Sequence, residues 1–349
     1  MTGRAHPLFG GRTLAQWIRA GGQPERGPVG YFQRLRWHAY WFEHNWRSQV
    51  KALAAIELPE DPVFILGLWR SGTTVFHELL APTSRWYTPQ TWQCFNPSTC
   101  FQTAPPSRHS SIGRPMDRGL ISTNSPQEDE FALLLLGEPS VYRGFIDPRR
   151  LRECGQELWQ PQDSAMQRWQ DFLRCGLQGT QTRQLLLKSP SHTFRLPVLR
   201  LLFPRARFIW IGRHIGEVLA SNRRMWREMA KRYALWNCPE ETLEGFLQDM
   251  LEATCGVLTQ CLDGMPQDRL LWVDFEQLRS EPRSVMHRVL RFLDPKAPIE
   301  GLERALLQTP VYNGSPARLP SGSAHVQRLH TLIAAARQRF GPAAAGYER

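Results

Sequence analysis

The segment from Asp61 to Thr74 constrains the fold of this chain more than any other. It reads Asp-Pro-Val-Phe-Ile-Leu-Gly-Leu-Trp-Arg-Ser-Gly-Thr-Thr, an apolar run followed by a turn of small residues. The apolar run at 63–66 predicts a buried strand, and the spaced apolar residues after Gly72 predict a helix. Such a strand, turn and helix N-terminus form an anion site, because backbone N–H groups and the helix dipole point toward the ligand.

This loop resembles the phosphate-binding loop of nucleotide triphosphatases but departs from it at one position. Gly67 and Gly72 have the spacing of the G-x-x-x-x-G motif, yet Thr73 stands where that motif requires Lys. We therefore interpret the loop as a cradle for a phosphate-like group other than the β- and γ-phosphates of ATP.

Most of the remaining chain alternates short apolar runs with amphipathic segments. Further strands are predicted at 185–188, 207–211 and 270–273. Helices are predicted at 72–81, 127–136, 160–179, 193–203, 215–233, 240–262, 282–292 and 326–340. This alternation predicts an α/β fold with a parallel sheet and helices on both faces. In such sheets ligands bind beyond the carboxyl ends of the strands, where Lys188 and Arg213 also lie.

The predicted organisation is a single domain over residues 59–349, preceded by an N-terminal extension of residues 1–58. Spaced apolar residues between Tyr31 and Ile56 predict one or two helices that pack on the domain. Residues 82–127 are rich in Pro, Ser, Thr and Trp, and predict a long irregular segment. Long loops in compact domains usually serve function.

The composition narrows the class of protein without choosing the ligand. The formal net charge of +11 suits a charged nucleotide, a nucleic acid or an anionic membrane. Seven cysteines without a C-x-x-C pair argue against a zinc site or a disulfide framework. Because no apolar run is long enough to span a bilayer and no secretory leader is recognisable, we expect a soluble cytoplasmic protein without a transmembrane segment.

Four motifs, each at a predicted junction of strand and helix, resemble those of bacterial sulfotransferases that use 3′-phosphoadenosine-5′-phosphosulfate (PAPS). They are R-S-G-T-T at 70–74, L-K-S-P-x-H at 187–192, F-P-x-A-x-F at 203–208 and R-x7-S at 213–221. The segment 273–278, in which the end of a strand is followed by an acidic residue and a Leu, is also similar to a segment of that family. The resemblance runs from about 61 to 293, and it implies a P-loop-like sulfotransferase fold.

The resemblance implies which residues bind the donor. The 5′-phosphosulfate would be held by Arg70 and by the amides of Ser71, Gly72, Thr73 and Thr74. Arg213 and Ser221 would bind the 3′-phosphate, because an Arg fork and a hydroxyl suit a terminal phosphate. The missing Lys fits a donor transferred without a metal ion, since a phosphosulfate carries less charge than a triphosphate. Relatives often have Asp-Pro after this Arg, whereas His214-Ile215 follows here.

Sulfuryl transfer requires charge stabilisation at the leaving phosphate and removal of a proton from the acceptor hydroxyl. Lys188 is the candidate for the first role. His192, expected to face the same rim, and Glu128, in an acidic stretch before an apolar helix, are alternative general bases. Glu128 also fits a capping box with Ser125, and the acids at 129–130 are expected to be solvated first-turn charges.

The sequence thus predicts a PAPS-dependent sulfotransferase acting on a hydroxyl of a small molecule, natural product or lipid. Aromatic residues of the irregular segment indicate an apolar acceptor; they are Trp86, Tyr87, Trp92, Phe95 and Phe101. The tail at 312–323, with Arg318, would close over the nucleotide. A homodimer is one option for the assembly.

Three alternatives stay open from the sequence. The first is a P-loop kinase or other nucleotide triphosphatase, with Asp274 binding Mg²⁺ at the end of an apolar strand. The second is a basic nucleic-acid-binding protein, although no helix-turn-helix, zinc or RNA-binding signature supports it. The third is a sulfotransferase-like chain that has lost activity.

Overall fold

The computed structural model describes a large part of the chain in two compact units. The described residues are 43–51, 56–83, 86–102, 111–113, 120–159, 166–178, 180, 182, 184–296, 300–309 and 324–341. Unit 1 comprises 1–58, 89–183 and 225–246, and unit 2 comprises 59–88, 184–224 and 247–349. Of the predicted N-terminal extension, residues 43–50 are helical, whereas 1–42 and the tail 310–323 lie outside the described residues.

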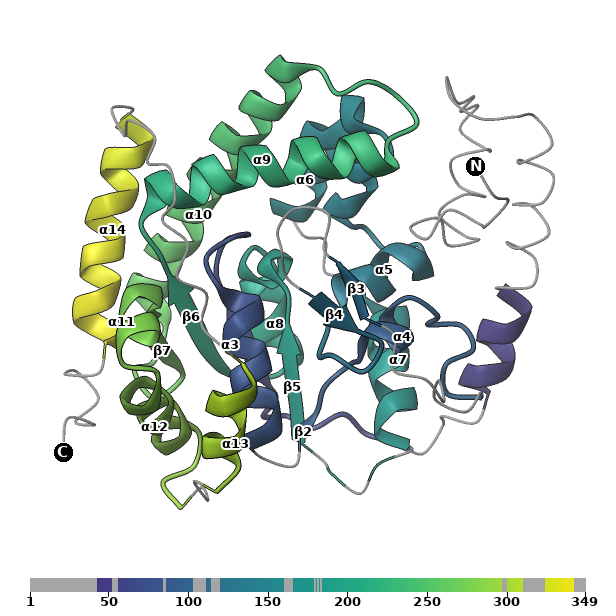
Figure 1. The fold of residues 1–349 in the computed structure, drawn as a ribbon, viewed down its shortest axis with the longest axis horizontal. Coiled ribbons are helices and arrows are strands. Elements are labelled where there is room, and N and C mark those ends of the chain that lie inside the picture. The colour runs from purple at the N-terminus through teal and green to yellow at the C-terminus, as the bar shows by residue number, and fades with distance from the viewer. Residues whose placement is uncertain are drawn as a thin grey trace. The chain divides into compact units, whose positions relative to one another are not determined.

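Unit 2 contains a five-stranded parallel sheet (Figure 1). Its strands, in spatial order, are β2 (Trp86–Tyr87), β5 (Gln184–Lys188), β1 (Val63–Leu66), β6 (Arg207–Gly212) and β7 (Leu270–Asp274). The predicted parallel sheet is confirmed, with Phe64 paired to Leu187 on one side and to Phe208 on the other. The prediction missed β2, which falls in the segment expected to be irregular.

The carboxyl end of β1 is the point where the strand order reverses. From β1 the chain builds one side of the sheet with β2 and β5, and then crosses back to add β6 and β7. In open parallel sheets the crevice at such a switch point is where ligands bind. The loop that follows β1 begins at this point, so the topology supports the location predicted from the sequence.

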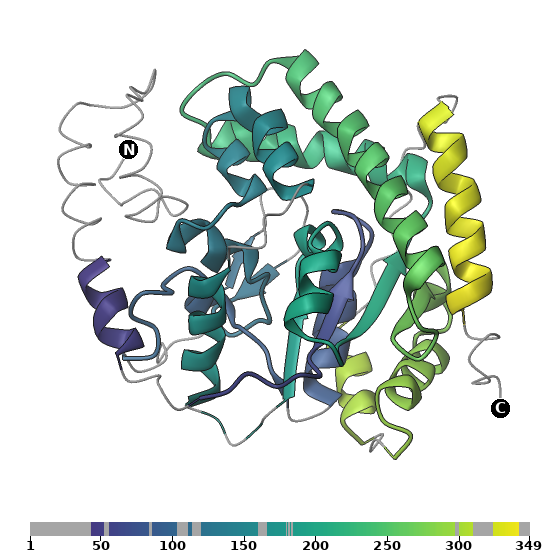
Figure 2. The ribbon, with the colours of Figure 1, turned by 180° about the vertical axis from the view of Figure 1, so that it is seen from behind.

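Side chains of β1 alternate between two apolar layers, because successive residues of a strand point to opposite faces. Ile65 lies in a core with residues of α3 (Thr73–Leu80), α11 (Phe275–Ser280), α12 (Pro282–Leu293) and α13 (Glu300–Gln308). Phe64 faces the other way, 5.8 Å from the Phe203 ring and 5.6 Å from the Phe208 ring. Figure 1 shows α3 in front of the strands, and Figure 2 shows α8 (Leu196–Leu202) on the opposite face.

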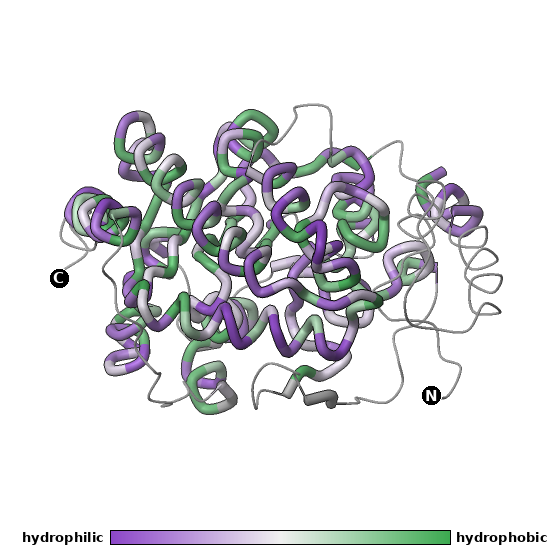
Figure 3. Tube along the Cα trace, turned by 90° about the horizontal axis from the view of Figure 1, so that it is seen from above, coloured by the Kyte–Doolittle hydropathy of each residue, from purple (hydrophilic) through white to green (hydrophobic). Residues whose placement is uncertain are grey.

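The longer helices agree closely with the sequence prediction. They are α9 (Ile215–Tyr233), α10 (Glu240–Gly264) and α14 (Ala324–Phe340). The boundary between the units falls within α9 and α10. Figure 3 shows polar and apolar residues alternating along the helices, as expected for elements with one buried face. The helix predicted at 193–203 is instead a 3₁₀ turn, η4 (Pro190–Thr193), followed by α8, since Pro197 suits the first turn of a helix.

Unit 1 is built from short elements. These are α4 (Thr91–Cys94), β3 (Ser111–Gly113), β4 (Leu120–Ser122), α5 (Glu130–Leu136), η2 (Val141–Phe145), η3 (Pro148–Arg150), α6 (Leu151–Trp159) and α7 (Gln167–Gln178). Strands β3 and β4 pair antiparallel. A series of ring contacts runs through the core of the unit: Tyr142 to Phe145 at 4.7 Å, Phe145 to Trp226 at 4.5 Å and Trp226 to Phe246 at 4.9 Å between centroids.

The aromatic residues from which an apolar acceptor is expected divide between the two units. Trp86 and Tyr87 form β2 in the sheet of unit 2, where Tyr87 is buried. In unit 1, Phe95 stacks on Phe131 at 4.8 Å and Phe101 packs on Phe172 at 5.5 Å. Trp92 is half-buried and donates to the Gln90 side chain at 2.8 Å. Phe95 and Phe101 thus pack on other rings of unit 1, and Tyr87 is buried in the sheet of unit 2.

Candidate functional site

Two positions of the loop after β1 accept only glycine, because a larger side chain would clash there. A third position holds an arginine in a strained backbone conformation. A Cβ on Gly67 would lie 2.6 Å from the Ile211 carbonyl oxygen, and a Cβ on Gly72 would lie 2.2 Å from the Phe275 ring. Gly67, Arg70 and Gly72 have φ angles of 139°, 71° and 103°. For Arg70 the left-handed conformation costs about 1–2 kcal/mol, which the surrounding contacts must offset.

Two buried polar side chains of unit 2 anchor this loop. The Thr193 hydroxyl of η4 accepts from the Gly67 N–H at 2.9 Å and donates to the Gly67 carbonyl at 3.1 Å. The Asn222 amide of α9 donates to the Trp69 carbonyl at 2.7 Å. The turn after β5 and the helix after β6 thus both hold the loop in place.

The N-terminus of α3 presents groups suited to an anion. Gly72 is its N-cap, and none of the described side chains caps it. The Ser71 hydroxyl is buried and has no hydrogen-bond partner among the described residues. Because the first turn of a helix leaves backbone N–H groups unsatisfied, a phosphate or phosphosulfate group fits here.

Arg213 and Arg70 meet beside this loop. Arg213 Nη1 donates to the Arg70 carbonyl at 3.2 Å, and its Nε donates to Glu217 Oε2 at 3.1 Å. The Arg213 guanidinium also lies 4.8 Å from the centre of the Phe275 ring. Arg70 Nε donates to Ser221 Oγ at 3.0 Å. The structure therefore brings together the predicted donor-binding residues Arg70, Arg213 and Ser221, and it adds Glu217 and Phe275.

Lys188 ends β5 with a buried ammonium group. The residue is 1% exposed, and its Nζ donates to Thr74 Oγ1 at 3.3 Å. His77 lies on the same face of α3, three residues after Thr74, and its Nε2 is 2.7 Å from Thr88 Oγ1. Burial, and next the positive charge of Lys188, holds the pKa of His77 well below its ordinary value. The sequence analysis missed His77, although its helical spacing from Thr74 could have indicated it.

His192 lies on the other face of the sheet from Lys188. Its ring is fully buried and packs edge-on against Phe64 at 5.5 Å between centroids. Lys188 instead points toward α3, in line with Leu186, which shares the α3 core. The two side chains thus leave β5 and its following turn on opposite sides, in contrast to the expected common rim.

In unit 1, Glu128 is half-buried at the start of the acidic stretch. Its Oε2 accepts a hydrogen bond from the Tyr142 hydroxyl. Tyr142 is itself fixed by ring contacts with Phe131 at 5.0 Å and Phe145 at 4.7 Å. The expected capping box is absent, because α5 begins only at Glu130 and Ser125 Oγ accepts from the Ser122 N–H instead.

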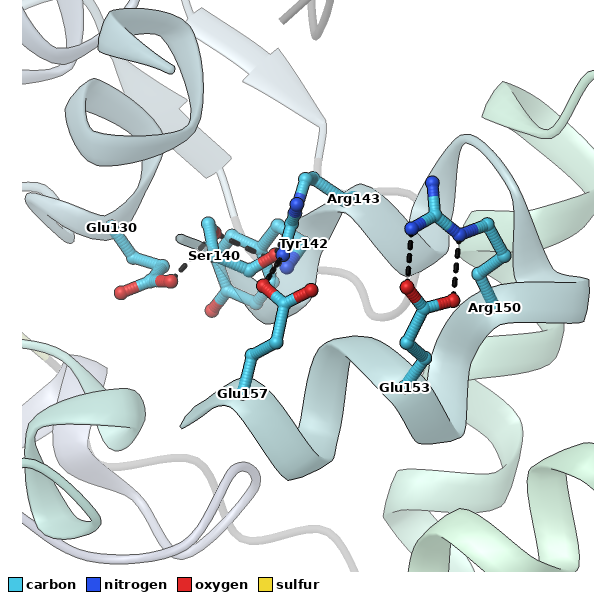
Figure 4. Close-up of polar contacts among 7 residues, drawn as sticks. All are labelled: Glu130, Ser140, Tyr142, Arg143, Arg150, Glu153 and Glu157. Carbon is cyan, nitrogen blue, oxygen red and sulfur yellow. Dashed lines mark hydrogen bonds and ion pairs between the residues drawn. The ribbon is translucent and has the colours of Figure 1, made fainter. Parts of the chain in front are cut away.

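The two acids after Glu128 are not solvated, so that expectation was wrong. Asp129 and Glu130 are fully buried. Asp129 accepts from the Trp169 indole at 2.7 Å, and Glu130 accepts from the Ser140 hydroxyl at 2.6 Å (Figure 4). Burial of a charged group requires such partners, so these acids hold α5 against α7 and η2.

Asp274, the carboxylate that a nucleotide triphosphatase would use to bind Mg²⁺, already accepts hydrogen bonds from two side chains of the protein. Asp274 accepts from the Trp272 indole at 3.1 Å and from Arg337 Nε of α14 at 2.7 Å. Within the described ranges, no group of three or more His, Cys, Asp or Glu side chains is arranged to hold a metal ion. None of the described helices is long and apolar enough to cross a membrane.

Curated proteins of known name resemble the chain over much of its length. It is 30% identical over 260 residues to the omega-hydroxy-beta-dihydromenaquinone-9 sulfotransferase Stf3 of Mycobacterium bovis and of Mycobacterium tuberculosis. The alignment covers 70% of this chain and 65% of those relatives, so the chain spans slightly less than two thirds of their length.

Solved structures share the fold. Sulfotransferase STF9 from Mycobacterium avium superposes with a TM-score of 0.67 at 19% identity, covering 92% of this chain and 88% of that one. Sulfotransferase STF1 from Mycobacterium tuberculosis H37Rv superposes with a TM-score of 0.62 at 16% identity, covering 92% of this chain and 90% of that one. A model of the sulfotransferase family matches residues 62–297, which include β1, β5, β6, β7 and the loops that follow them. The chain belongs to the sulfotransferase family.

Proposed function

We propose that this protein transfers the sulfuryl group of PAPS to a hydroxyl of an apolar small molecule or lipid. The observation that carries the proposal is the convergence of Arg70, Arg213 and Ser221 beside the N-terminus of α3. An anion cradle next to a second cluster of cationic and hydroxyl groups suits a nucleotide with phosphate groups on both its 3′ and 5′ positions.

The donor would be held at two places within unit 2. The amides of residues 71–74 and the buried Ser71 hydroxyl would bind the 5′-phosphosulfate, where the helix dipole favours negative charge. Arg213 and Ser221 would bind the 3′-phosphate, and the bond between Arg70 and Ser221 makes Arg70 a bridge between the two places. Pairing of Asp274 with Arg337 argues against the alternative Mg-nucleotide site.

Lys188 would stabilise the leaving phosphate. In the transfer, a bond forms between the acceptor oxygen and sulfur while the bond from sulfur to the 5′-phosphate oxygen breaks, and that oxygen keeps the electron pair. The acceptor proton passes to a base of the protein. A buried ammonium held near Thr74 needs little reorganisation when charge develops on the leaving oxygen.

We assign the role of general base to Glu128 rather than to His192. Glu128 is half-buried and oriented by Tyr142, so a carboxylate oxygen has a fixed direction while the side chain retains access to solvent. His192 is fully buried against Phe64. A base must be accessible to the proton that it abstracts, and the half-buried Glu128 side chain is more accessible than the fully buried His192 ring.

The relatives indicate the class of acceptor. The Stf3 proteins are named for an omega-hydroxylated dihydromenaquinone. We infer that this chain also acts on a hydroxyl of a hydrophobic acceptor, and that hydroxylated isoprenoid quinones are the compounds to test before polar alcohols.

Binding of 3′,5′-adenosine bisphosphate tests the donor assignment. We expect this nucleotide to raise the melting temperature more than ADP or ATP does, because a ligand that binds the folded state stabilises it by mass action. Arg213→Ala should weaken bisphosphate binding by about 10²-fold, on the scale of a lost charge-assisted contact of about 3 kcal/mol. Titration calorimetry of both proteins gives the two dissociation constants.

Arg227→Ala is the matched control, since Arg227 lies on α9, the helix that follows Arg213, but is exposed and pairs with Glu240. Its affinity should equal that of the wild type. If millimolar bisphosphate fails to stabilise the wild-type protein, the donor assignment is rejected.

Substitution of each candidate base distinguishes their roles. Glu128→Gln should lower kcat by about 10²-fold or more, since it removes the proton acceptor and keeps the hydrogen bond from Tyr142. His192→Gln should lower the melting temperature and leave kcat within tenfold, because the buried ring fills space against Phe64. Glu157→Gln, at an ion pair with Arg143, serves as control. Near-normal turnover of Glu128→Gln, or loss of turnover in well-folded His192→Gln, contradicts the assignment.

A further inference from the structure

Three polar side chains lie where β6 passes into α9: Arg213 stands just before the helix, and Glu217 and Ser221 lie within it. Arg213, Glu217 and Ser221 are spaced four residues apart, with Glu217 in the first turn of the helix. Residues four apart in a helix are neighbours on its surface. The Glu217 carboxylate therefore lies between the two groups proposed to bind the 3′-phosphate.

Glu217 already forms an ion pair with Arg213. Arg213 Nε and Glu217 Oε2 are 3.1 Å apart, and the two side chains are 17% and 10% exposed. A pair shielded to this degree is screened less by water and salt than the exposed pairs elsewhere on the chain. The carboxylate thus neutralises the guanidinium that the 3′-phosphate would have to engage.

The other contacts of Arg213 hold its direction without negative charge. One is the Arg70 carbonyl at 3.2 Å, and another is the face of the Phe275 ring at 4.8 Å. A phosphate that approaches this guanidinium adds a second anion next to the Glu217 carboxylate. Two anions bound next to the same guanidinium repel each other strongly in a partly buried site.

We propose that Glu217 is an internal counter-ion of Arg213 that competes with the 3′-phosphate and so limits the affinity for the nucleotide. This inference rests on the proposed function, because it concerns the same donor site. Glu217 makes binding of the bisphosphate product weaker than Arg213 and Ser221 alone would allow. Where product release limits turnover, such weakening raises kcat.

A purely structural role for Glu217 has a different signature. An acidic residue in the first turn stabilises a helix through its dipole, and Glu217 occupies that position. A structural role, or simple orientation of Arg213, predicts that any substitution leaves nucleotide binding unchanged or weaker. Competition predicts tighter binding when only the charge is removed.

The test compares Glu217→Gln and Glu217→Ala with Glu228→Gln. Gln keeps an oxygen that accepts from Arg213 Nε and removes the charge, whereas Ala removes both. Glu228 lies on the same helix and pairs with Lys231 at 2.7 Å, so its substitution controls for the loss of one charge. Each protein is titrated calorimetrically with 3′,5′-adenosine bisphosphate and with adenosine 5′-phosphate, which lacks the 3′-phosphate.

We expect Glu217→Gln to bind the bisphosphate about tenfold more tightly than the wild type, which corresponds to about 1.4 kcal/mol. Binding of adenosine 5′-phosphate should change by less than twofold, and Glu228→Gln should match the wild type for both ligands. Glu217→Ala should bind less tightly than Glu217→Gln, because Arg213 loses an orienting contact.

The inference is overturned if Glu217→Gln binds the bisphosphate no more tightly than the wild type, or if both ligands gain equally. A wild-type protein that does not prefer the bisphosphate over adenosine 5′-phosphate would instead reject the proposed donor site, and the inference with it. These two failures are distinguishable, because the second is seen in the wild type alone.

Discussion

We expect Lys188→Met to lower kcat by about 10²- to 10³-fold and to leave the protein folded, which is the scale seen when one preorganised donor to a developing anion is removed. The ammonium is 1% exposed and held 3.3 Å from Thr74 Oγ1, so solvent cannot replace it readily. Met fills a similar volume with a flexible apolar chain, which limits the loss of packing. Single-turnover kinetics with PAPS and a hydroxylated acceptor measures the effect on the chemical step.

Two further observations separate the chemistry of Lys188 from its packing. Lys231→Met removes an exposed lysine with 72% side-chain exposure, and its kcat should stay within twofold of the wild type. The pKa of His77, which the charge of Lys188 helps to lower, should rise in Lys188→Met while burial still keeps it below the ordinary value. A folded Lys188→Met protein with more than a tenth of the wild-type kcat refutes the role of Lys188 at the leaving group.

We expect Gly72→Ala to destabilise the protein by about 3 kcal/mol or more, the sum of a left-handed backbone penalty and overpacking. The backbone at Gly72 has φ 103°, and an added Cβ would lie 2.2 Å from the Phe275 ring. The melting temperature should fall by roughly 4 °C or more, since an unfolding entropy of about 2.1 cal/mol/K per residue makes each kcal/mol worth about 1.4 °C in a chain of 349 residues. Differential scanning calorimetry without ligand measures the change.

The matched control is Gly256→Ala. Gly256 lies within α10, and a Cβ added there meets nothing within 4 Å among the described atoms. Ala in the middle of a helix is favoured over Gly by about 0.5–1 kcal/mol, so this variant should be as stable as the wild type or more stable. If Gly72→Ala melts within a degree of the wild type, the loop can relax and does not form the rigid cradle described above.

Local sequence signals predicted four strands of the sheet but not the edge strand β2. The strands β1, β5, β6 and β7 are apolar runs flanked by turn residues, and such runs can be recognised as buried strands from the local sequence alone. β2 has only two residues and exists because Trp86 pairs with Gln184, almost a hundred positions away in the sequence. Helix α6 was missed although Leu151, Cys154 and Leu158 have helical spacing and are buried, so the pattern was available.

The candidate site was predicted where contacts are local and missed where they depend on tertiary structure. Arg213 stands just before α9 and Ser221 lies within it, and the anion loop is a single segment, so motif spacing alone could group these residues. The hydrogen bond from Arg70 to Ser221 joins residues 151 positions apart, so no local pattern in the sequence could predict it. Tyr142, which orients Glu128, is likewise found only through the folded structure.

The pairing of β2 with β5 has a consequence for how such a chain can evolve. The long segment between Trp86 and Gln184 leaves the sheet at one strand and returns at its neighbour, and these two residues are partners in the ladder. Neighbouring strands lie about 4.8 Å apart, so the two ends of the segment are anchored side by side. Insertions and replacements within it leave the distance between its anchors unchanged. Lineages can therefore remodel this part of the chain while the framework that positions the loop after β1 is inherited intact.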